Sequence, residues 1–188
     1  MKRIVFILLT GILLESHAQT SLEEIRLSYF SPFGNNFGAK LGTTLPIKDW
    51  EDQKKEGITS SLFLAPQLGF FVRPSVNRNY LINAEIGIKR SAIERKSYLA
   101  YSFGIGYLLS SEVLGGAVNL GTGDFTENTE LRSFLLPTLN VELGSNKRKR
   151  FTLFYRLSYG RKISFNDEDA GFFAFEIGTR FLIKPPSK

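Results

Sequence analysis

Glu176 and Arg180 stand four residues apart in an otherwise apolar segment, 170–183, which reads AGFFAFEIGTRFLI. In a β-strand successive side chains point to opposite faces, so residues at even spacing share a face. Glu176 and Arg180 therefore face one side, while the phenylalanines at 173, 175 and 181 face the other. Buried charges persist only when they are paired. The segment predicts a strand with an apolar face and a face that carries paired charges.

The N-terminus has the features of an export signal. A basic start precedes an apolar run, 4–14, which is too short to span a bilayer comfortably. The Ser-His-Ala triplet that ends at Ala18 matches the small-x-small pattern of signal peptidase sites, and this predicts cleavage after Ala18. Residues 1–18 are expected to be the signal peptide and 19–188 a single mature domain. A retained N-terminal anchor is the alternative.

Reactive side chains are scarce in the mature chain. Cysteine is absent, and the one histidine, His17, precedes the cleavage site. Catalytic triads built on histidine or cysteine and Cys/His zinc sites are thereby excluded. Ser-Lys and Asp-Asp chemistry stays open, although no such pair stands out at the strand ends. The sequence predicts no catalytic, cofactor-binding or metal-binding residue and no cofactor, and therefore a protein that is not an enzyme.

The basic residues do not form a nucleic-acid surface. The mature chain has 22 lysines and arginines against 17 acidic residues, and most of these bases are scattered among the expected strands. The exception is the run 147–150, which lies in a turn and is typical of a solvated loop. Together with export, this predicts no nucleic-acid partner.

Apolar and polar residues alternate along most of the chain, between clusters of Gly, Asn, Pro and charged residues. Several of the alternating segments have ten residues or more, and a tilted strand needs roughly 9–11 residues to cross a bilayer. The pattern predicts eight strands, at about 23–33, 37–47, 57–73, 79–91, 95–110, 129–144, 150–164 and 170–184.

The two faces of these strands differ in composition. One carries large apolar and aromatic residues, many near strand ends, as expected for aromatic girdles at membrane interfaces. The other is rich in Gly, Ala and Ser, which suits a narrow barrel interior. The fold class predicted is all-β, an eight-stranded antiparallel up-and-down transmembrane β-barrel. A soluble sandwich or lipocalin-like barrel is the alternative. Pro66 and Pro137 fall within strands and should each mark a bulge or a local break.

The interior of an eight-stranded barrel is only wide enough to be filled by side chains. Charged residues on the inward face are therefore expected to form a hydrogen-bonded plug. The charge network predicted for the lumen consists of Arg26, Lys40, Glu85, Lys89, Arg132, Glu142, Arg156, Glu176 and Arg180.

The last strand carries the pattern Glu176-x-Gly178-x-x-Phe181-x-Ile183. It resembles the signal by which the barrel assembly machinery recognises a final strand, although many such proteins end on an aromatic residue and this chain continues to 188. With the alternation over 19–188, the chain resembles the small outer-membrane β-barrel proteins of Gram-negative bacteria, the group around outer membrane proteins A and X. A glutamine directly after the cleavage site resembles exported proteins of the Bacteroidota. The resemblance implies an outer-membrane location, with outer-membrane lipid and the assembly machinery as partners.

Two functions are consistent with such a barrel. The first is a structural or interaction role, either alone or as a subunit of a larger envelope complex with another envelope protein as partner. The alternative is a narrow porin-like pore or carrier for small solutes. Enzymes also occur among barrels of eight to twelve strands, but those known to us use histidine.

The longest expected connection, 111–128, is the candidate contact surface. Eight strands place both termini on one side, periplasmic in the usual arrangement, so this connection faces outward. A mobile tip without a partner is the alternative reading. Its apolar residues are Val113, Leu114, Val118, Leu120 and Phe125.

Overall fold

The computed structural model describes residues 24–51, 57–92, 97–118, 125–145, 150–164 and 169–183, with the backbone alone for 117–118 and 125–127. The signal peptide predicted for residues 1–18 and its cleavage site lie outside this part. Eight strands make up the described chain: β1 (Glu24–Pro32), β2 (Phe37–Glu51), β3 (Ile58–Arg73), β4 (Asn77–Ala92), β5 (Ser97–Val118), β6 (Phe125–Ser145), β7 (Phe151–Ser164) and β8 (Ala170–Leu182).

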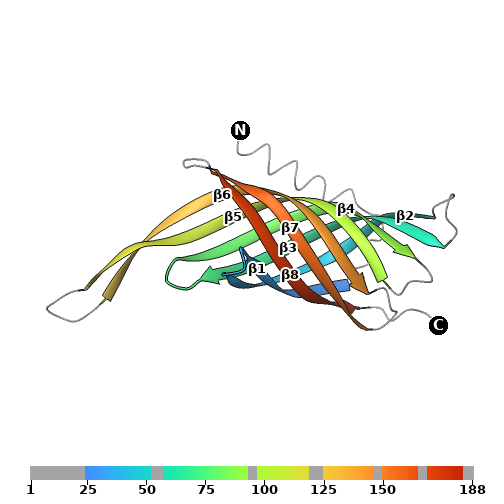
Figure 1. The fold of residues 1–188 in the computed structure, drawn as a ribbon, viewed down its shortest axis with the longest axis horizontal. Coiled ribbons are helices and arrows are strands. Elements are labelled where there is room, and N and C mark those ends of the chain that lie inside the picture. Colours follow the sequence, from blue (N-terminus) through green and yellow to red (C-terminus); the bar gives the residue numbers. More distant parts are fainter. Residues whose placement is uncertain are drawn as a thin grey trace.

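The strands form one closed barrel in chain order, and every neighbouring pair is antiparallel (Figure 1). β8 closes the barrel against β1 over nine residue pairs, from Glu24 opposite Leu182 to Pro32 opposite Ala174. Closure gives every strand two partners, so no edge is left along the barrel wall. The predicted all-β, eight-stranded, antiparallel up-and-down barrel is confirmed.

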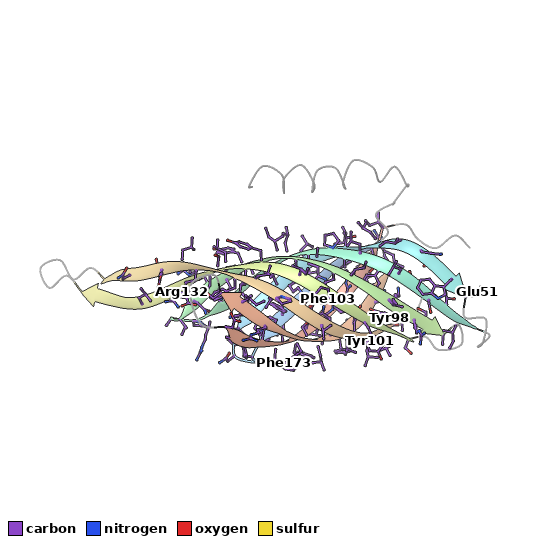
Figure 2. All side chains as sticks on the ribbon, turned by 90° about the horizontal axis from the view of Figure 1, so that it is seen from above. Glu51, Tyr98, Tyr101, Phe103, Arg132 and Phe173 are labelled. Atoms are coloured by element: carbon purple, nitrogen blue, oxygen red, sulfur yellow. The ribbon has the colours of Figure 1, made fainter. Side chains whose placement is uncertain are left out.

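Outward positions carry the large apolar side chains. Tyr159 and Leu139, for example, are 68% and 62% exposed, and the apolar surface continues over all eight strands. The side chains project from the ribbon all around the barrel in Figure 2. A continuous apolar surface of this size is far larger than the patches that monomeric proteins expose to water. It suits contact with lipid, whereas a soluble barrel would turn its apolar face inward.

Both prolines interrupt one ladder and leave the other intact. The β2–β3 pairing passes from Gly42–Gln67 to Leu45–Leu64 and skips the positions around Pro66. The β6–β7 pairing likewise skips Pro137, whereas the ladders on the opposite sides of both prolines run through. A proline has no N–H to donate. The local breaks predicted at Pro66 and Pro137 are confirmed.

The connection expected at 111–128 is wrong for most of its length. β5 continues to Val118 and β6 begins at Phe125, so Val113, Leu114, Val118 and Phe125 lie in strands; Leu120 lies outside the described residues. The ladder between the two strands absorbs a register shift between Val113 and Gly115 and then continues.

This hairpin extends past its neighbours. The β4–β5 ladder ends at Asn77–Glu112, and the β6–β7 ladder begins at Phe134–Ser164. Beyond these pairs, β5 and β6 form a two-stranded ribbon that projects from one end of the barrel (Figure 1). We call residues 113–118 and 125–133 the ribbon. The start of β1 and the end of β8 lie at the opposite end of the barrel.

Candidate functional site

Arg156 on β7 is the centre of the charged interior. Its guanidinium donates from Nη1 to both oxygens of Glu85, at 2.9 and 3.1 Å, and from Nε to Glu142 at 2.9 Å. The carboxylate of Glu176 lies 3.9 Å from Nη1. The side chains of Arg156 and Glu85 are each 1% exposed. One arginine thus holds carboxylates from β4, β6 and β8 across the lumen.

Further pairs surround this centre. Lys40 lies 2.9 Å from Glu176, and Arg26 pairs with Glu142. Nearer the terminal end, Arg180 lies 3.3 Å from Glu24. We call the whole set the ionic layer: Glu24, Arg26, Lys40, Glu85, Glu142, Arg156, Glu176 and Arg180.

Neutral side chains complete the hydrogen bonding of these carboxylates. Ser28 donates to Glu176 at 2.6 Å, and the Tyr98 hydroxyl donates to Glu142. Asn83 and Ser102 each donate to Glu85 at 2.9 Å. A buried ion pair offsets its desolvation only when such extra hydrogen bonds are present. The arrangement is a plug of paired charges, in which Nε of Arg180 is a buried donor without a partner.

Two of the nine residues predicted for the network lie apart from it. Lys89 faces inward, with its ammonium 4.8 Å from the centre of the Tyr98 ring, and no described carboxylate pairs with it. Arg132 lies on the ribbon, where its half-buried side chain pairs with Glu130 at 2.8 Å and Glu112 at 3.5 Å. Figure 2 shows Arg132 toward the ribbon end and Tyr98 toward the other. The ion pairs given for Arg132 thus lie outside the charge network around Arg156.

Sequence reasoning missed a second layer of the interior. Toward the ribbon end, inward positions of six strands carry buried apolar residues, which we call the apolar layer: Phe30, Phe71, Leu81, Leu108, Phe134, Leu136, Phe172 and Ala174. The rings of Phe30 and Phe71 meet edge to face, with centroids 5.5 Å apart. The signal was present in the sequence, because at this end of several strands both faces are apolar, as in Phe70-Phe71 and Phe172-Phe173.

A second, smaller apolar cluster, Phe63, Ala65, Tyr98 and Ala100, adjoins the ionic layer. Ala65 lies opposite Glu85 in the β3–β4 ladder, and the Tyr98 hydroxyl donates to Glu142. The ion-paired side chains around Arg156 are at most 6% exposed. In low-dielectric surroundings of this kind, hydrogen bonds are stronger and unpaired charges more costly.

The residues of the predicted assembly signal have separate surroundings. Glu176 belongs to the ionic layer, and Gly178 faces inward, where a Cβ would lie 2.6 Å from the Cβ of Ser28. Phe181 meets Phe151 edge to face at 4.9 Å, and Ile183 is exposed after the end of β8. Each of the four residues thus packs against other side chains or faces outward. Recognition of these residues by the assembly machinery stays a prediction.

No cluster of three or more His, Cys, Asp or Glu residues that could hold a metal ion occurs in the described part of the chain.

Among the described residues, no helix is long and apolar enough to cross a membrane.

The sequence matches no family model and no curated protein. Its structure is similar to that of the outer membrane enzyme PagL, with a TM-score of 0.55 and 10% identity over 85% of this chain and 99% of PagL. Neisserial surface protein A gives 0.48 and 11%, over 85% of this chain and 95% of that chain. The N-terminal β-barrel domain of OprF from Pseudomonas aeruginosa gives 0.44 and 11%, over 85% and 98%. Likeness at this identity shows the fold alone.

Proposed function

We propose that this chain is a non-enzymatic outer-membrane β-barrel whose filled barrel serves as an anchor for an interaction surface on the ribbon. It is expected in a Gram-negative outer membrane, of the Bacteroidota type that Gln19 indicates, after export and cleavage at Ala18. The fold shared with PagL and the apolar outer surface both support a membrane setting.

The observation that carries the interaction role is the ribbon itself. Beyond the pairs Asn77–Glu112 and Phe134–Ser164, its two strands pair with no further strand among the described residues, and one hydrogen bond from the Val113 N–H to the Val76 carbonyl, 2.9 Å, joins the base of the ribbon to the β3–β4 turn. An isolated two-stranded hairpin is marginally stable in water, and unpaired strand edges are ready to accept another chain. The ribbon also exposes large apolar side chains, with Leu131 66% and Leu114 57% exposed. A partner that covers the ribbon would pair its strand edges and bury its exposed apolar side chains.

The filled interior argues against transport as the main role. Arg156 and its carboxylates occupy the width of the barrel at one level, and the apolar layer occupies it at another. A pore would need a continuous water-filled path through both layers. A narrow porin-like pore is therefore only the second candidate function, and conductance measurements in planar bilayers test it.

The experiment that tests the interaction role removes the ribbon beyond the Val113–Thr129 pair. In the variant, residues 114–128 are replaced by Asn-Gly, a sequence that favours a tight hairpin turn. Replacement of the β1–β2 turn, 33–36, is the control, and heat-modifiable mobility on gels verifies that both variants fold. We expect the native chain and the control to migrate in a larger assembly on native gels of outer-membrane extracts, and the ribbon variant to migrate alone. Identical migration of all three would overturn the interaction role.

A further inference from the structure

The outer surface of the barrel is grooved over β2 to β6, near the terminal end. The groove has a volume of about 730 Å³, and its lining includes Ile86, Ile88, Tyr101 and Leu139 together with Trp50 and Arg90. The aliphatic members lie at outward positions, and Ile86, Ile88, Tyr101 and Leu139 are 42–62% exposed. A groove of this composition fits an acyl chain.

One end of the groove is polar. The ladders place Trp50 opposite Ser60, and Ser60 opposite Arg90, so the three residues share the outward face at one level. Ser60, between them on β3, is only 1% exposed. Trp50 and Arg90 thus flank Ser60 from β2 and β4, at the end of the groove that lies farthest from the ribbon.

Arg90 differs from the arginines of the lumen. Those in the lumen are buried and paired with carboxylates, whereas Arg90 is exposed on the apolar outer face. No carboxylate among the described residues lies within ion-pair distance of it. A guanidinium in such a position binds phosphate oxygens well, because its fork of N–H donors matches their geometry. Tryptophan favours the same depth, at the interface between headgroups and acyl chains.

We propose that this groove is a binding site for an anionic glycerophospholipid. Arg90 holds the headgroup phosphate, Trp50 lies beside the glycerol region, and one acyl chain follows the groove along Ile88 and Ile86. The site rests on the membrane setting of the proposed function, and it adds a lipid preference that this setting alone does not imply.

The chain offers a direct probe, because Trp50 is its only tryptophan. Bromine atoms on an acyl chain quench tryptophan fluorescence on contact. The native protein is reconstituted in phosphatidylcholine vesicles in which a set mole fraction is replaced by brominated phosphatidylglycerol or by brominated phosphatidylcholine. We expect the anionic lipid to associate with the Trp50 site about fivefold more strongly than the zwitterionic one, the effect expected of one arginine near a membrane surface. We expect Arg90→Gln to lose this preference.

Arg78→Gln is the matched control. Arg78 lies on the same strand and is exposed, but it stands at the other end of β4. The preference should survive in this variant. Equal quenching by the two lipids in the native protein, or the same preference in Arg90→Gln, would overturn the lipid site and leave the membrane setting intact. Absence of quenching by either brominated lipid would overturn the membrane setting as well.

Discussion

The ionic layer and the apolar layer fill the same barrel by different means. In the ionic layer, long side chains from facing strands meet near the centre, and Arg156 alone contacts carboxylates from two strands within 3.1 Å. In the apolar layer, rings and aliphatic chains pack without directed bonds. The difference is one of tolerance. Apolar packing can relax around a small change, whereas a charge that loses its partner in a dry lumen has no substitute for it.

The largest effect is expected from Arg156→Leu. The change leaves Glu85 without its cationic partner and Glu142 with Arg26 alone. Removing one partner of a buried pair costs about 3–5 kcal/mol, because the remaining charge stays desolvated. Urea unfolding of the barrel in lipid vesicles measures this loss.

Arg161→Leu is the control for that change. Arg161 lies on the same strand and pairs with Asp169 at 3.1 Å, but its side chain is 66% exposed. Exposed pairs contribute about 0–1 kcal/mol. A cost for Arg156→Leu as small as this would mean that water reaches the ionic layer.

In the apolar layer, Leu108→Ala should cost about 2–5 kcal/mol, depending on how far the site collapses. Leu108 is fully buried, and its side chain packs within the apolar layer. The neighbouring Leu109→Ala, on the outward face, should cost less because lipid tails fill the space that it leaves. The same unfolding assay compares the two. Equal costs would show that the interior at this level is no better packed than the lipid outside.

The two layers also differ in how far the sequence predicts them. Alternation shows which face a residue occupies, and this was enough to direct Glu85, Glu142, Arg156 and Glu176 inward. Alternation does not show how far along the barrel axis a residue lies. Arg132 shares the inward phase of β6, but its level is past the last pair with β7, and it therefore lies on the ribbon.

The level of a residue along the barrel axis depends on strand register and on strand length, which are fixed by pairing between distant segments. Glu85 and Arg156 are 71 residues apart in the chain and meet only because β4 and β7 face each other across the closed barrel. The same limit explains why a connection was wrongly predicted at 111–128, since no local feature showed that β5 and β6 would extend past the neighbouring strands. The apolar layer was missed for another reason: apolar residues on both faces hide the alternation at that end of the strands.

The apolar outer surface is a third environment. Its contribution to stability should depend on the charge of a substituted side chain and not on its volume. Leu139→Arg places a guanidinium on the lipid-facing side of β6, where the leucine is 62% exposed. Near the bilayer midplane this should cost about 2–4 kcal/mol. Leu131→Arg, on the ribbon past the last β6–β7 pair, should change stability by about 0.5 kcal/mol or less. Equal tolerance at both positions in the unfolding assay would mean that Leu139 does not meet lipid.

Conductance is the smallest expected signal, because the native barrel should give no stable steps in planar bilayers. The comparison becomes sharper when each layer is opened separately. Arg156→Ser should still not conduct, since the apolar layer lies above it, and a Leu108→Ala, Phe172→Ala variant should not conduct because the ionic layer lies below. The three changes combined should give leak currents, since small side chains then leave space at both levels. Steady channels in the native protein would support the pore reading. Conductance after opening only one layer would show that this layer alone closes the lumen.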